Sequence, residues 1–185
     1  MGRKNYNTII ALDLFNNIQY LKTGTACQQR AYALLQDNNV IVSLHQYSPI
    51  LAGTIPLAID IEGSDLDILC QFSDQQLFIN SLQNSFSKFR NYNLRQVIIN
   101  NEPTVIANFY IDDFEVEVFG QAVPLKQQAG YCHMIIEYNI LLQKGEEFRK
   151  QIIALKKASY KTEPVFAKLL GLQGDPYIEL LNYKL

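Results

Sequence analysis

Residues 53–68 read GTIPLAIDIEGSDLDI and carry four carboxylates, at Asp60, Glu62, Asp65 and Asp67. On a β-strand, residues two apart project to the same face, so Asp65 and Asp67 stand side by side while their apolar neighbours turn to the core. Adjacent carboxylates repel each other unless a cation or a shared proton lies between them, so the pair favours a hard-cation site. A solvated strand end is the structural alternative.

A later strand offers a third acid. Residues 114–120, FEVEVFG, place Glu115 and Glu117 on one face and apolar side chains on the other. Protein Mg²⁺ sites typically use one or two carboxylates together with substrate phosphates, and an acid from a neighbouring strand can complete a two-metal site. The alternative is that both glutamates form the exposed face of an edge strand.

These motifs follow one another in an informative order. Gly53-Thr54 precedes, by ten residues, the hydrophobic-flanked Asp65 and Asp67, and a strand with an acid between apolar residues comes later. The order resembles the nucleotidyltransferase superfamily of polymerase-β-like fold. Residues 53–57, GTIPL, are also similar to the GrpB-like branch of this superfamily. The whole chain resembles a bacterial family recorded as a domain of unknown function.

The resemblance implies an α+β fold and an enzyme, a Mg²⁺-dependent transferase that moves a nucleotidyl group from a nucleoside triphosphate to an unidentified acceptor. Asp65 and Asp67 would bind two Mg²⁺ ions as catalytic residues. We expect Glu117 as the third catalytic and metal-binding acid, rather than Glu115, because it lies nearer the middle of its strand. The resemblance also implies that nucleotide contacts come from the residues of the two motifs, Gly53, Thr54 and Ser64.

The spacer, residues 55–63, departs from the superfamily pattern. It contains no basic residue, whereas a triphosphate normally finds cations nearby. This departure favours an alternative function, a nucleotide-binding, ligand-binding or interaction protein that has the nucleotidyltransferase fold without the catalysis.

The C-terminal part holds further candidates. Residues 144–168 contain seven Lys or Arg but only three Glu, so this segment is net positive. We expect Thr162 to be the N-cap of a helix with Pro164 in its first turn. Lys161 beside it should face the acidic cleft and contact phosphate or an acidic acceptor. An ordinary capped helix is the alternative. His133 and Glu137 stand four residues apart on a predicted helix, a spacing that suits a metal pair or a simple helix-face contact.

The 185 residues favour one domain over 1–185, because apolar residues are spread evenly and no linker or repeat is present. We expect a nucleotidyltransferase-like mixed sheet with packed helices over residues 1–125, including a strand meander at 94–100, 104–111 and 114–120. Helical periods at 131–143, 146–158 and 162–171 predict a helical C-terminal lobe over 126–185. Ser73 is the expected N-cap of a helix at 74–87.

Composition narrows the function classes. The net charge is −2 with a pI near 5.7, which argues against a strongly basic protein that binds along a nucleic-acid backbone. The sequence also contains no motif for sequence-specific nucleic-acid binding. Three scattered cysteines predict reduced thiols rather than disulfides. Residues 1–10 lack a signal-peptide core, and no run has the length of a membrane span, so we expect a cytoplasmic protein with no membrane partner.

Overall fold

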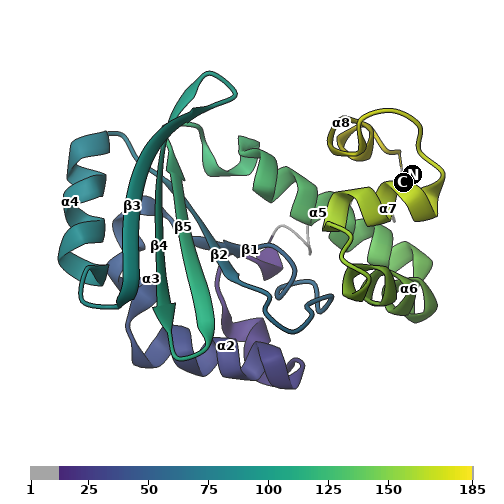
Figure 1. Cartoon of the computed structure of the whole chain (residues 1–185), viewed down its shortest axis with the longest axis horizontal. Helices are drawn as coiled ribbons and strands as arrows, with labels where there is room; N and C mark the ends of the chain where they lie inside the picture. Colours follow the sequence, from purple (N-terminus) through teal and green to yellow (C-terminus); the bar gives the residue numbers. More distant parts are fainter. Residues whose placement is uncertain (1–12, 185) are drawn as a thin grey trace.

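The computed structural model describes residues 13–184 of the chain, so the N-terminal stretch that bears on a signal peptide lies outside the described residues. A five-stranded sheet runs through the middle of the molecule in the order β1-β2-β5-β4-β3 (Figure 1). Strand β2 pairs with β5 in parallel, and the other neighbours are antiparallel. The strands are β1 (Ile50–Ala52), β2 (Leu66–Gln71), β3 (Arg90–Ile99), β4 (Glu102–Ile111) and β5 (Phe114–Gln121).

Helices flank the sheet on both sides (Figure 1). The α-helices are α2 (Ala26–Asp37), α3 (Val40–Ser43), α4 (Gln75–Phe86), α5 (Ala129–Lys144), α6 (Glu146–Lys157), α7 (Thr162–Leu170) and α8 (Pro176–Leu181). Short 3-10 turns cover Gln19–Thr23, His45–Tyr47 and Leu125–Gln127. This arrangement confirms the α+β fold, the strand meander and the helical C-terminal part. Helix α8 was not predicted, because its six residues are too short to show a helical period.

One face of the sheet is the main core. Alternate residues of β2, β4 and β5 point to this face because the side-chain period of a strand is two. Among them, Ile68, Phe109 and Val118 are fully buried, and they belong to one apolar cluster with Leu35 of α2 and Phe78 of α4. Helices α2 to α4 therefore cover this face.

The opposite face is covered only in part. Ile50, Ala52 and Leu69 on the β1–β2 side of the sheet belong to a second apolar cluster with Tyr131 and Met134 of α5. Helices α5 to α8 pack around this cluster, to the right of the sheet in Figure 1. The rest of this face carries polar side chains of β2, β5, β4 and β3.

Two predicted helix caps were wrong. The N-cap of α4 is Asp74, whose side chain accepts a hydrogen bond from the Leu77 amide, and not Ser73. The N-cap of α7 is Lys161, while Thr162 is already the first helical residue and caps nothing. In both cases the helix boundary differs by one residue from the predicted one, which is the usual scatter of helix ends. None of the helices within residues 13–184 is long and apolar enough to cross a bilayer.

Candidate nucleotide and metal site

A cleft of about 1230 Å³ lies between the polar part of the sheet and the C-terminal helices. This volume is large enough for a nucleotide-sized ligand. Its charged lining includes three acids from the sheet side and three residues from the helical side: Asp65, Asp67, Glu117, Lys156, Lys161 and Glu163. The structure therefore brings the predicted acids and the predicted Lys161 to a single cleft.

Strand register explains why these acids meet. The parallel pairing of β2 with β5 sets Asp67 directly opposite Glu117, and the antiparallel pairing of β4 with β5 sets Asn108 opposite Glu117. Directly opposed residues share a face of the sheet. Asp67, Glu117 and Asn108 thus form one polar row across three strands, and the exposed Asp65 precedes the first of them.

A glycine turn closes tightly over this row. Ala52 pairs with Asp67, so the chain leaves β1 at Gly53 directly beside the Asp67 carboxylate. Gly53 has φ +77°, and a Cβ at this position would lie 2.2 Å from Asp67 Oδ2. Only glycine combines this backbone conformation with such a close approach.

We therefore expect Gly53→Ala to damage the site more than its backbone cost alone would. The added methyl must displace the Asp67 carboxylate, and the positive φ costs about 1–2 kcal/mol for an L-residue. Gly63→Ala is the matched control, because Gly63 has φ +81° but nothing lies within 4 Å of its added Cβ. Urea unfolding should show destabilisation in both variants, and a larger one in Gly53→Ala because of the displaced carboxylate. Mg²⁺-dependent nucleotide binding should be lost only in Gly53→Ala. Equal loss of binding in both variants would contradict this.

The electrostatics of Asp67 are unusual for a carboxyl group. Burial raises its pKa to about 8, and the negative charges of Asp65, Glu117 and Glu163 act in the same direction. Lys156 opposes them with a smaller effect. Because the carboxylate form is disfavoured, a cation bound among these acids would stabilise it.

This pKa predicts how stability depends on pH in the metal-free protein. An unfolded Asp67 loses its proton near pH 3.8, whereas the folded one keeps it to about pH 8. Between these values the folded state binds more protons, so the free energy of unfolding should fall as pH rises. Since one pKa unit corresponds to about 1.4 kcal/mol and cleft water screens part of it, we expect a loss on the order of 3 kcal/mol.

The measurement is urea unfolding at pH 5 and pH 8 in a chelating buffer. Asp67→Asn has no proton to lose, so its stability should vary less between these pH values than that of the wild type. Glu62→Gln, at an exposed position of the same acidic stretch, should follow the wild type. Parallel profiles for wild type and Asp67→Asn would refute the assignment.

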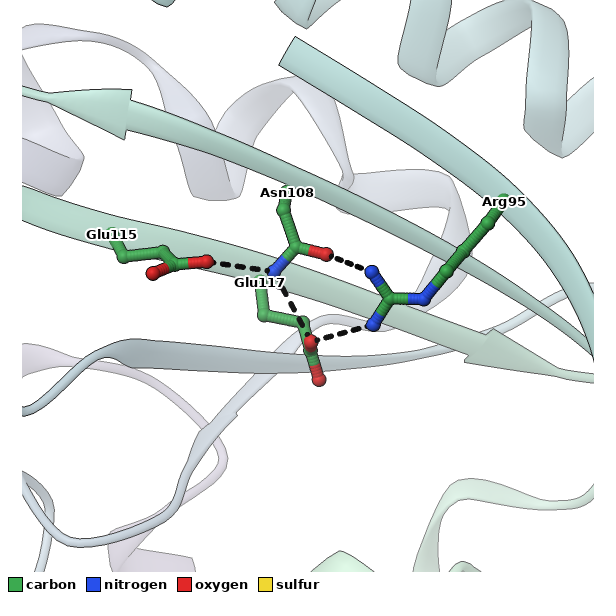
Figure 2. Close-up of polar contacts among 4 residues, drawn as sticks. All are labelled: Arg95, Asn108, Glu115 and Glu117. Atoms are coloured by element: carbon green, nitrogen blue, oxygen red, sulfur yellow. Dashed lines mark hydrogen bonds and ion pairs between the residues drawn. The ribbon is translucent and has the colours of Figure 1, made fainter. Parts of the chain in front are cut away.

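Glu117 is held by a polar network (Figure 2). Arg95 donates to Asn108 Oδ1 at 2.7 Å and to Glu117 Oε2 at 3.3 Å. Asn108 Nδ2 also donates to Glu117 Oε2 at 3.1 Å and to Glu115 Oε1 at 3.2 Å. Figure 2 shows the second Glu117 oxygen pointing away from Arg95 and Asn108, so the network orients the carboxylate without occupying both oxygens.

The three acids do not yet surround a common point. Asp65, Asp67 and Glu117 do not form a group whose ligand atoms all lie within 4.8 Å of one another. Their chemistry nevertheless fits Mg²⁺, which prefers carboxylate oxygens, and the half-buried Asp67 carboxylate favours a positive neighbour.

The spacer between the motifs is a braced loop. Thr54 Oγ1 donates to Ser64 Oγ at 3.4 Å, and the Ile61 amide donates to the same oxygen at 3.0 Å. Thr54 lines the cleft, but Ser64 is not among its lining residues. Ser64 thus closes the ends of the loop, and its predicted contact with nucleotide stays a prediction.

Basic residues missing from the spacer are supplied by α6. Arg149 donates to the carbonyl oxygens of Leu57 and Ala58, and Lys156 Nζ donates to that of Ile59 at 2.9 Å. These contacts fix the loop against α6 and bring the Lys156 side chain to the cleft.

The start of α7 faces the same cleft as the sheet acids. Lys161, Thr162 and Glu163 all line it, while Val165 and Phe166, further along α7, are fully buried. The helix therefore both docks on its neighbours and presents its first residues to the cleft.

Other site residues were missed by sequence reasoning. Asn108 could have been found, because a two-residue turn at Asp112-Asp113 pairs Ile111 with Phe114 and so sets Asn108 opposite Glu117. Arg95 and Lys156 carry no local signal, since their roles depend on strand pairing and helix packing far from the motifs.

Together the mixed sheet, the acidic row and the glycine turn define a protein with a nucleotidyltransferase fold, and solved structures bear out the fold. The chain resembles GLD-2 in the GLD-2/RNP-8 complex with a TM-score of 0.54 and 11% identity, over 88% of this chain and 62% of that one. It resembles Cid1 poly(U) polymerase bound to Mg 3'-dATP with a TM-score of 0.51 and 10% identity, over 95% of this chain and 53% of that one. This chain thus spans less than two thirds of those proteins.

The match of the sequence to a family model identifies the family of this chain. Residues 33–183 match the family described as a domain of unknown function, DUF4269, and this chain belongs to that family. None of the curated protein sequences matches it.

Proposed function

We propose that this chain is a Mg²⁺-dependent nucleotidyltransferase that moves a nucleotidyl group from a nucleoside triphosphate to a hydroxyl or similar acceptor. The observation that carries the proposal is the convergence of Asp65, Asp67 and Glu117 on one cleft beside the Gly53 turn. The fold shared with a poly(U) polymerase supports it.

In this proposal Asp65, Asp67 and Glu117 hold the metal ions. When bound, Mg²⁺ supplies charge neutralisation for the phosphates and lowers the pKa of the attacking hydroxyl. Gly53 lets the backbone approach the site closely, and Thr54 follows it at the cleft wall. Arg95 and Asn108 position Glu117 through its Oε2 atom.

The helical side of the cleft supplies the positive charge that the spacer lacks. Lys156 and Lys161 both line the cleft. A triphosphate carries several negative charges, and charge-assisted hydrogen bonds from nearby cations are stronger than neutral ones. We therefore assign the triphosphate to the space between the acidic row and these two lysines, and Lys161 to a phosphate contact.

The experiment is a pyrophosphate-release assay with each of the four ribonucleoside triphosphates, with and without Mg²⁺, and with small hydroxyl compounds and oligonucleotides as acceptors. We expect pyrophosphate and a labelled acceptor to form together and only with Mg²⁺. Pyrophosphate release that is independent of Mg²⁺ or unaffected by Asp67→Asn would contradict the proposal.

A second candidate function is ligand binding without turnover. The observation that favours it is that the three acids are not gathered and that Arg95 and Asn108 already engage Glu117. Under this alternative, nucleotide binds in the cleft but no acceptor is labelled in any combination.

Several expectations from the sequence stay predictions. They are the likeness to the GrpB-like branch, the bacterial source, the cytoplasmic location and the single domain over 1–185.

A further inference from the structure

Three side chains gather on the helical wall of the cleft, apart from the acidic row. His133 and Glu137 lie one turn apart on α5, and Glu163 is the second residue of α7. One ligand atom from each, a ring nitrogen and two carboxylate oxygens, lies within 4.8 Å of the others. Within residues 13–184 no other group of three His, Cys, Asp or Glu side chains meets this distance.

Two members of this cluster are buried without hydrogen-bond partners. His133 is 7% exposed and Glu137 is 4% exposed. His133 Nδ1 and Glu137 Oε1 are both buried, and neither atom has a hydrogen-bond partner. Because buried polar atoms are nearly always paired, these two atoms favour a bound ligand between His133 and Glu137.

The two carboxylates of the cluster also lack a direct ion-pair partner. No Lys or Arg of the described part of the chain makes an ion pair with Glu137 or Glu163. Lys156 is near enough to influence the pKa of Glu137, yet its Nζ donates to the carbonyl oxygen of Ile59 at 2.9 Å. Burial lowers the pKa of His133, which favours the neutral imidazole that a metal requires.

We propose that His133, Glu137 and Glu163 bind one divalent first-row transition-metal ion, with Zn²⁺ as the probe. Imidazole suits Zn²⁺ and related ions, whereas Mg²⁺ and Ca²⁺ prefer oxygen ligands alone. Two carboxylates neutralise the charge of the dication. Ligand atoms of a tetrahedral Zn²⁺ site stand about 3.4 Å apart, so closing the cluster takes roughly 1 Å of side-chain movement.

The site would join helices α5 and α7 across the cleft wall. All three residues line the cleft, so the fourth position of a tetrahedral ion is placed on the cleft side. Its ligands are different from Asp65, Asp67 and Glu117. The inference therefore does not depend on the proposed nucleotidyl transfer.

The test is calorimetric titration of the chelator-stripped full chain with Zn²⁺ in excess Mg²⁺, together with Co²⁺ absorption spectra. We expect one equivalent to bind, a visible Co²⁺ band, and a higher midpoint of thermal unfolding with Zn²⁺. Glu137→Gln should weaken Zn²⁺ at least about 100-fold, since even changes beyond the direct ligands cost 10–100-fold. The matched control, Glu147→Gln on the exposed side of α6, should bind like the wild type.

Circular dichroism checks that Glu137→Gln is folded. If that variant does not fold, Glu163→Gln is used in its place, because Glu163 is only partly buried. Asp67→Asn should keep the Zn²⁺ equivalent, which separates this site from the proposed Mg²⁺ site. The inference is overturned if the wild type binds no Zn²⁺ under these conditions, because a shared proton then holds the cluster. It is also overturned if binding survives in the glutamine variants or is lost in Asp67→Asn.

Discussion

The double variant Asp65→Ala with Asp67→Ala should lose Mg²⁺-dependent pyrophosphate release by at least about 10³-fold. Both carboxylates would bind the metal, and removing even one group that stabilises transition-state charge costs about 10²–10³-fold. The variant should remain folded, because burial and neighbouring acids make the charged form of Asp67 unfavourable in the metal-free protein. Initial rates at saturating nucleotide, with circular dichroism as the folding check, are the measurement.

Glu62→Ala is the matched control for this variant. Glu62 belongs to the same acidic stretch, but it is exposed and does not line the cleft. Its rate should stay within a few-fold of the wild type. If the double variant keeps its activity, the assignment of the acidic pair is wrong.

Glu117→Gln should lower the same rate by at least about 100-fold. The register sets Glu117 opposite Asp67, and both of its hydrogen bonds end on Oε2, which leaves Oε1 outside the network. Glutamine keeps the size of the side chain but removes the charge that a metal ligand needs. Steady-state rates across a Mg²⁺ titration should show a raised Mg²⁺ requirement as well as a lower maximum.

Glu115→Gln decides between the two candidate acids. Both oxygens of Glu115 are engaged, Oε1 by Asn108 and Oε2 by the Tyr110 hydroxyl at 2.8 Å, and Glu115 does not line the cleft. Its rate should change only a few-fold. A larger loss in Glu115→Gln than in Glu117→Gln would reverse the assignment.

Local patterns were enough to predict most of the fold. Residues 104–111 and 114–120 are rich in β-branched and aromatic side chains and predicted the central strands, and helical periods predicted α5 to α7. Strand β3 begins at Arg90, four residues before the predicted start, because its exposed residues show little apolar alternation. Helix ends were less predictable, since Asp74 and Lys161 take the N-cap positions expected one residue away.

The site could be predicted from the sequence only where its residues are close together in the chain. Asp65 and Asp67 are two residues apart where β2 begins, Asp65 just before the strand and Asp67 in it, and both line the cleft. The parallel register that brings Glu117 to Asp67 is a tertiary pairing between distant strands. Glu163 comes close to Glu137 only through the tertiary packing of the C-terminal helices, for which no spacing in the sequence gives a signal.

Calorimetric titration with a non-hydrolysable nucleoside triphosphate tests the central claim most directly. The wild type and the Asp65→Asn with Asp67→Asn variant are each titrated with and without Mg²⁺. We predict that Mg²⁺ strengthens binding to the wild type at least about tenfold, or 1.4 kcal/mol, and that the variant shows no such gain. If no triphosphate binds the wild type in a Mg²⁺-dependent way, or if the variant shows the same gain, the account is contradicted.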